Sequence, residues 1–119
     1  MFQSSPLLRW SATVLLLGGS ALAQSAFNRF TQECVYNLAI QQEVYAMDHK
    51  MKYVVSASGT GNKTTAPFKG KYSPNCEAQV SWKITRDGKG FKITAFHPKG
   101  TLVYTFTKST AKITSARRK

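Results

Sequence analysis

The chain has 119 residues, with 17 lysines and arginines against five aspartates and glutamates, so its formal net charge is +12. A chain of this length makes one domain rather than two. Its charge would attract polyanions such as nucleic acid, anionic lipid headgroups, acidic glycans and acidic protein faces; a solvated basic surface that only keeps the protein soluble is an equally weighted alternative.

The first 23 residues have the pattern of a secretory signal peptide. Arg9 precedes an apolar run over residues 12–17, and the segment closes on Ala21-Leu22-Ala23, the small-x-small pattern that a signal peptidase cuts. Glycines interrupt the run, which is shorter than the roughly 20 residues that a spanning helix needs. We therefore predict a secreted protein that begins at Gln24, with no membrane insertion after cleavage.

The chain contains two cysteines, Cys34 and Cys76. In a secreted chain, two cysteines most simply form one disulfide. Zinc would need more soft ligands at a motif spacing than the cysteines and the two histidines provide. The sequence therefore predicts a Cys34–Cys76 bridge, no metal site and no cofactor.

The rest of the chain reads as β-structure after a lead-in over residues 24–33. Apolar residues alternate over 34–40 and again over 45–57, which is typical of half-buried strands. The second run is long enough that we expect a bend or a bulge near residues 48–50. Residues 58–67 are rich in Gly and Asn and predict a loop, and residues 68–72 predict a short basic strand.

A clear hairpin follows, from residues 78–84 through an Asp-Gly turn to residues 91–95. A second turn leads to a strand over residues 102–107, and Trp82 stands among the inward positions of the first strand. Strands at this spacing indicate a sandwich or a small barrel. Residues 109–119 predict a basic, disordered tail with at most one weak strand, over residues 111–114.

These patterns predict an all-β fold: a six- to seven-stranded antiparallel β-sandwich of two small sheets over residues 34–108, stapled by one disulfide. No combination of residues predicts an enzyme. His49 is expected to be a half-buried packing residue, and His97, which precedes a proline in a turn, is expected to be exposed and inert. A phosphate-cleaving trio of His97, Glu77 and Arg86 is a weak alternative without support from spacing.

Basic side chains gather on the predicted hairpin, where they form a candidate binding surface: Lys83, Arg86, Lys89 and Lys92. The alternation places Lys83 and Lys92 on its outer face and the other two at its tip. The competing interpretation is that lysines protect exposed strands from edge-to-edge aggregation. Asn62-Lys63-Thr64 is a glycosylation sequon in a predicted loop, so Asn62 is a candidate glycosylation site.

The segments ECVYNLAI and SPNCEAQV place one cysteine at the start of the first predicted strand and the second about forty residues later, before a late strand. With the signal peptide and the small β domain, this arrangement resembles the MAX effectors of plant-pathogenic fungi. The resemblance implies a six-stranded sandwich of two three-stranded sheets with one disulfide, secretion during infection, and action on host proteins. Only Cys34 and Cys76 transfer from that family, which has no shared catalytic site. We count three strands after Cys76, where the family pattern has two.

Two functions follow. The first is a secreted, monomeric, non-enzymatic effector that binds an unidentified host protein. Recognition by a plant immune receptor and translocation into host cells are left open. The alternative is a basic secreted toxin or antimicrobial that binds anionic membranes or nucleic acid. Neither implies a small-molecule substrate.

Overall fold

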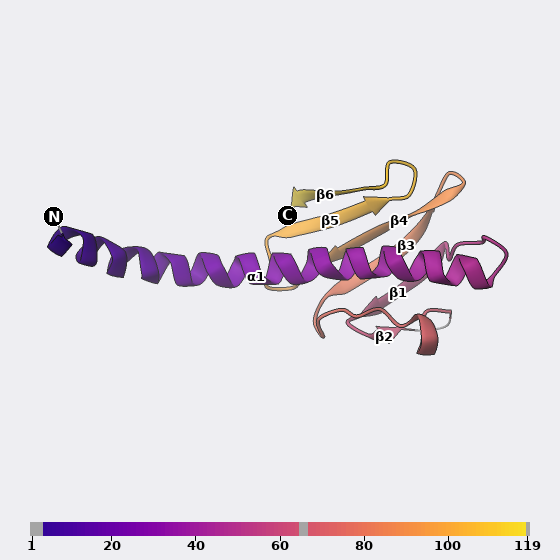
Figure 1. Cartoon of the computed structure of the whole chain (residues 1–119), viewed down its shortest axis with the longest axis horizontal. Coiled ribbons are helices and arrows are strands. Elements are labelled where there is room, and N and C mark those ends of the chain that lie inside the picture. Colours follow the sequence, from indigo (N-terminus) through magenta and orange to yellow (C-terminus); the bar gives the residue numbers. More distant parts are fainter. Residues whose placement is uncertain (1–3, 65–66, 119) are drawn as a thin grey trace.

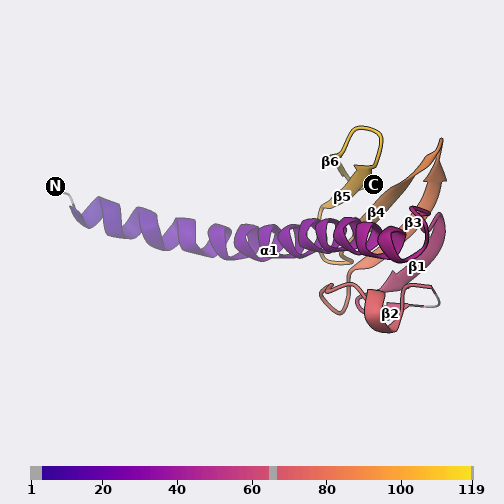
Figure 2. The ribbon, with the colours of Figure 1, turned by 45° about the vertical axis from the view of Figure 1, so that its right-hand side comes forward.

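The computed structural model describes residues 4–64 and 67–118. One long helix, α1 (Ser4–Asp48), lies across one face of a single antiparallel sheet (Figure 1). The second half of the helix packs on the sheet, and the first half projects beyond it (Figure 2). No helix in the described part of the chain is both long and apolar enough to cross a bilayer.

The sheet has six strands in the order β2-β1-β3-β4-β5-β6. Each neighbouring pair is antiparallel. The strands are β1 (Ser56–Thr60), β2 (Lys63–Thr64), β3 (Ser81–Asp87), β4 (Gly90–Phe96), β5 (Leu102–Thr107) and β6 (Lys112–Arg117), and a 3-10 turn, η1 (Gly70–Tyr72), lies in the long connection before β3. The prediction of antiparallel β-structure of six to seven strands with one disulfide is confirmed, with six strands in the described residues. The all-β fold class is wrong, because α1 is a helix.

The two-sheet sandwich is not what the described residues form, since all their strands join one sheet and a helix takes the place of the opposing layer. Residues 34–40 lie in α1, so the first predicted strand is wrong. The buried positions of α1 between residues 31 and 46 are Thr31, Cys34, Val35, Leu38, Gln42 and Ala46. They recur every three or four residues, which is the helical period.

The helix ends at Asp48 in a left-handed turn. Lys50 and Met51 have positive φ, and the Met51 N–H donates to the Ala46 carbonyl at 2.7 Å, which satisfies a free carbonyl of the last helical turn. The strand predicted over residues 45–57 is therefore also wrong, because β1 begins only at Ser56. The basic strand predicted over residues 68–72 is a loop that contains η1.

The predicted meander is confirmed in β3, β4 and β5. Gly88 takes a positive φ in the turn between β3 and β4, as the Asp-Gly pair indicated. The weak strand predicted at residues 111–114 is present and longer, as β6. The expected disordered tail is therefore largely strand, and Arg118 continues the pairing by donating its N–H to the Thr101 carbonyl.

The core lies between α1 and the inner face of the sheet, defined here as the face toward the helix. Its sheet side is built by Trp82, Ile84, Phe91, Ile93 and Ala95, all of which are buried. They pack with residues of α1 and with Phe68 and Cys76 of the long connection. The prediction that Trp82 is buried is confirmed, and its indole N–H donates to the Gly61 carbonyl at 3.0 Å.

Candidate functional site

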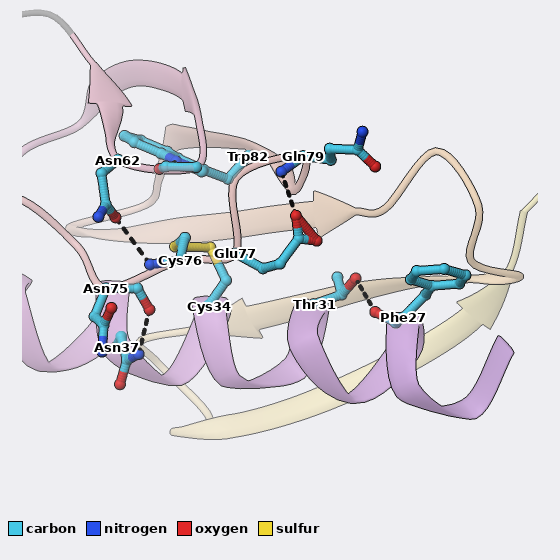
Figure 3. The surroundings of a disulfide bond; sticks show 11 residues. Phe27, Thr31, Cys34, Asn37, Asn62, Asn75, Cys76, Glu77, Gln79 and Trp82 are labelled. Atoms are coloured by element: carbon cyan, nitrogen blue, oxygen red, sulfur yellow. Dashed lines mark hydrogen bonds between the residues drawn. A yellow bond between two sulfur atoms is a disulfide. The ribbon is translucent and has the colours of Figure 1, made fainter. Parts of the chain in front are cut away.

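The disulfide joins α1 to the segment that leads into β3 (Figure 3). Cys34 and Cys76 are both buried, and the bridge is the predicted one. Hydrogen bonds on either side hold the same segment: Asn37 donates to the Asn75 carbonyl at 2.6 Å, and the Cys76 N–H donates to Asn62 Oδ1 at 2.9 Å. The bridge therefore fixes the helix, the long connection and the β1–β2 turn to one another.

His97 is completely buried, so the prediction of an exposed, inert histidine is wrong in its first part. Its Nδ1 accepts the Lys99 N–H at 3.0 Å, which places the ring proton on Nε2. Nε2 lies 2.7 Å from Glu77 Oε2, although the N–H does not align as a hydrogen bond, and the Phe27 ring stacks on the imidazole with centroids 4.4 Å apart. A ring enclosed in this way supports the fold and has no access to a substrate.

Glu77 and His97 do meet, but Arg86 lies at the β3–β4 turn, away from them, so the phosphate-cleaving trio is not assembled. His49 is exposed rather than half-buried, and its ring stacks on Tyr45 with centroids 3.8 Å apart. Within residues 4–64 and 67–118, no three His, Cys, Asp or Glu side chains come together in a way that could hold a metal ion.

The predicted basic surface divides between the two faces of the sheet. Lys83 and Lys92 point away from the helix and are exposed, as the alternation predicted. Arg86 pairs with Phe91, which points toward the helix, so Arg86 belongs to the inner side at the turn end of the hairpin. There it lines a hollow of about 320 Å³ together with Lys89 and Met51.

The outer face, defined as the sheet face away from α1, gathers three cross-strand rows of side chains. Beyond the first row, Asp87 of β3, which pairs with Gly90 of β4, lies on the same face. Strand register gives the three rows fifteen positions on β1, β3, β4, β5 and β6. They are Ser56, Thr85, Lys92, Thr107 and Lys112 in the first row; Ser58, Lys83, Thr94, Thr105 and Thr114 in the second; and Thr60, Ser81, Phe96, Val103 and Ala116 in the third. None of the fifteen is acidic. Lys112 was missed by sequence reasoning because its segment was expected to form at most a weak strand in a disordered tail, which gave no face on which to place it.

A second surface lies between α1 and the last two strands. The β6 groove has a volume of about 340 Å³ and is lined by Tyr36, Ala39, Ile40, Glu43, Phe106, Ala111 and Ile113. Tyr36 and Ile40 lie one helical turn apart on α1 and are 59% and 43% exposed. The groove is therefore an apolar surface that the fold leaves open to solvent.

The open edge of the sheet borders this groove. The Arg118 N–H donates to the Thr101 carbonyl, so these two residues form a hydrogen-bonded pair. Hydrogen-bonded and non-hydrogen-bonded pairs alternate along an antiparallel ladder. The even-numbered residues of β6 therefore bond to β5. The N–H and C=O groups of Ile113, Ser115 and Arg117 then point outward. No described strand pairs with β6 on that side.

Acidic side chains are largely engaged by basic or phenolic groups. The Lys71 ammonium and the Tyr72 hydroxyl donate to Asp48 at 2.7 and 2.8 Å, which lowers the pKa of Asp48 and raises the pKa of Lys71 and of Tyr72. Lys108 donates to Glu43 at 2.8 Å, and this bond, with a further contribution from Tyr53, raises the pKa of Lys108.

Asn62 lies in the turn between β1 and β2 and is exposed, although its Oδ1 accepts the Cys76 N–H. Its glycosylation stays a prediction.

No known family model matches the chain, and no characterised protein or solved structure matches it. The two surfaces themselves, the outer face and the β6 groove with its open edge, are the basis for inferring function.

Proposed function

We propose that the protein is a secreted, non-enzymatic, effector-like protein that binds a host protein by accepting one of the partner's strands beside β6. The observation that carries the proposal is the position of an open strand edge directly beside an exposed apolar groove. Strand addition takes its affinity from backbone hydrogen bonds and its specificity from pockets for alternate side chains.

Both requirements are present at β6. The outward N–H and C=O groups of Ile113, Ser115 and Arg117 would pair with an incoming backbone. Alternate side chains of that strand would lie on the inner side of the sheet, next to Ile113 and beneath Tyr36 and Ile40 of the helix. Burying these exposed apolar side chains supplies the free energy that a flat polar edge lacks.

Charge favours a different protein over a second copy of this chain. The formal net charge of +12 makes two copies repel each other. Lys112 and Arg117 on β6 are both exposed, so a partner strand with acidic side chains fits this edge better than an identical basic one. A monomer in solution is therefore part of the proposal.

Secretion and the effector role rest on the signal-peptide pattern and on the disulfide, which is stable in oxidising compartments. The resemblance to MAX effectors of plant-pathogenic fungi supports a host protein as the partner. The proposal does not depend on the sandwich fold of that family.

The proposal is tested by capturing host proteins with the oxidised chain and comparing edge variants. Ser115→Pro removes one outward N–H and keeps the bonds to β5, since proline is tolerated at outward positions of edge strands. Ser115→Val, which retains the N–H, is the matched control. A partner held by strand addition is retained by the wild type and by Ser115→Val, and is lost with Ser115→Pro.

The groove is tested separately with Tyr36→Ser and Ile40→Ser. Met51→Ser is the control, because Met51 is 67% exposed but lies outside the groove. Equal capture by Ser115→Pro and by the wild type, from protein that is equally folded, would exclude the β6 edge as the binding surface.

A further inference from the structure

We propose that the outer face binds a linear polysaccharide that carries carboxylate or sulfate groups. This site is separate from the β6 groove, so the inference goes beyond the proposed function and does not depend on it. The outer face is the sheet surface that the single described helix leaves uncovered, since α1 packs on the opposite face (Figure 2).

The composition of the outer face carries the inference. Of the fifteen positions in its three rows, nine are serine or threonine, three are lysine and three are apolar. Asp87, at the β3–β4 turn, is the one acidic residue that the described strands add to this face. Serine and threonine hydroxyls both donate and accept hydrogen bonds. Sugar hydroxyls have the same two capacities, whereas the lysines supply the positive charge that an acidic sugar needs. The first two rows consist of these two groups alone, and they match a polymer that offers hydroxyl and anionic groups together.

The spacing of the lysines favours a polymer over a small anion. Lys92 and Lys112 stand in the same row two strands apart, which separates them by roughly 10 Å. Lys83 is a diagonal neighbour of Lys92, at about 7–8 Å. These distances separate backbone positions, and no strand pair sets two of the lysines directly opposite each other. Each contact with an exposed lysine is weak, so useful affinity requires a ligand that repeats its charge along a chain.

Other polyanions fit the outer face less well. Single-stranded nucleic acid is held by aromatic rings on which the bases stack. Phe96 is the one aromatic residue on this face, and the Arg118 guanidinium already covers its ring at 4.5 Å from the centroid. Membrane binding needs an apolar anchor, and the apolar residues here form one short row of Phe96, Val103 and Ala116 that includes no long aliphatic side chain.

The experiment measures binding of the purified, oxidised chain to immobilised polygalacturonate and heparin at low salt. These two probes separate carboxylated from sulfated chains. Neutral dextran, a single-stranded RNA homopolymer, and vesicles of equal parts phosphatidylcholine and phosphatidylserine are measured beside them. We expect at least one acidic polysaccharide to bind more tightly than dextran, RNA and vesicles, and to be released as salt rises and screens the charges.

Variants then locate the site. The triple change Lys83→Gln, Lys92→Gln, Lys112→Gln should weaken binding about tenfold, as expected when three weak ion pairs with the polymer are removed together. The matched control Lys50→Gln, Lys52→Gln, Lys69→Gln removes the same charge from exposed lysines elsewhere and should weaken binding much less. The double change Thr94→Val, Thr105→Val removes two hydroxyls and no charge, and should also weaken binding to the polysaccharide.

Three outcomes would overturn the inference. Tighter binding to RNA or to the vesicles than to either acidic polysaccharide would assign the outer face to another class of ligand. An equal loss in the two triple variants would show that net charge alone is responsible. Unchanged binding in the threonine variant, with its melting temperature preserved, would leave the hydroxyl rows without a role. Ser115→Pro should bind the polysaccharide as the wild type does, so failure of this inference and of the proposed function are distinguishable.

Discussion

Gln42 of α1 and Val54 exchange two hydrogen bonds, in the way that two strand residues do. The Gln42 side-chain amide donates to the Val54 carbonyl at 2.6 Å, and the Val54 N–H donates to Gln42 Oε1 at 2.8 Å. Gln42 is fully buried and Val54 nearly so. The Gln42 side chain therefore pairs with both backbone polar groups of Val54, a residue that lies outside the strands, and it ties the segment before β1 to the helix.

Replacing Gln42 with leucine should lower the free energy of unfolding by about 2–5 kcal/mol, because both buried backbone groups of Val54 lose their partner. Urea denaturation measures the change. The control is Gln32→Leu, an exposed glutamine on the same helix, which should shift stability by no more than about 0.5 kcal/mol. Equal effects of the two substitutions would contradict the pairing.

Loss of the disulfide should cost about 4 kcal/mol, the chain-entropy value for a loop whose ends are 42 residues apart. Thermal melting of Cys34→Ser, of Cys76→Ser and of the reduced wild type measures it, and all three should lower the melting temperature similarly. A reduced form that melts within a couple of degrees of the oxidised one would show that the bridge has no structural role.

Trp82→Ala should cost about 3–5 kcal/mol, because it empties a large space in the core. Trp82→Phe keeps much of the packing and loses the hydrogen bond to the Gly61 carbonyl, so it should cost less. Chemical denaturation of both variants separates packing from hydrogen bonding. The opposite ranking would mean that the indole N–H matters more than the ring.

The Asp48 cluster predicts a dependence on pH. The lowered pKa of Asp48 contributes stability above the unfolded value of about 3.9, and this contribution is lost as the pH falls through the folded pKa. The raised pKa of Tyr72 contributes below the unfolded value of about 10, and that contribution is lost as the pH rises through the folded pKa. Stability due to this cluster should therefore be greatest between these limits.

The variant Asp48→Asn tests the coupling. It removes the carboxylate that accepts the Tyr72 hydroxyl, so Tyr72 should ionise at a lower pH than in the wild type. Tyrosinate absorbance, with Tyr72→Phe to identify the signal, follows the titration. Asp87→Asn makes the same charge change in the β3–β4 turn and should leave the Tyr72 titration where it is.

Cleavage after Ala23 should leave the fold intact. Two interactions tie the helix after this point to the sheet region: Phe27 stacks on His97, and Asn28 accepts the Thr101 and Leu102 N–H groups. N-terminal sequencing of the secreted protein should begin at Gln24, and its melting temperature should match that of the full chain. A truncation that begins at Arg29 removes both of these interactions and should melt lower.

The strongest predictions from sequence were those that depend on neighbouring residues. The alternation in β3, β4 and β5 and the Asp-Gly turn between β3 and β4 are local signals, and they placed Trp82 in the core and Lys83 and Lys92 on the outer face. The disulfide followed from the number of cysteines and the expected compartment. None of these depended on knowing how distant segments meet.

The helix was missed because its buried stripe is partly polar. Cys34, Tyr36, Leu38 and Ile40 alternate as a strand does, and a short apolar run fits either period. Thr31 and Gln42 complete the helical spacing, but a polar residue does not register as a core position until its partner is known. For Gln42 that partner is the backbone of Val54, twelve residues away.

Tertiary structure alone decided which surfaces remain open. The sequence determined that alternate residues of the last strands face opposite sides of the sheet. It did not determine that a helix would cover one face and leave the serines, threonines and lysines of the other face exposed. It also did not reveal that β6 would end the sheet beside Tyr36 and Ile40. Side-chain alternation is fixed by the geometry of each strand, whereas the exposure of a face or an edge depends on which distant segment packs against it.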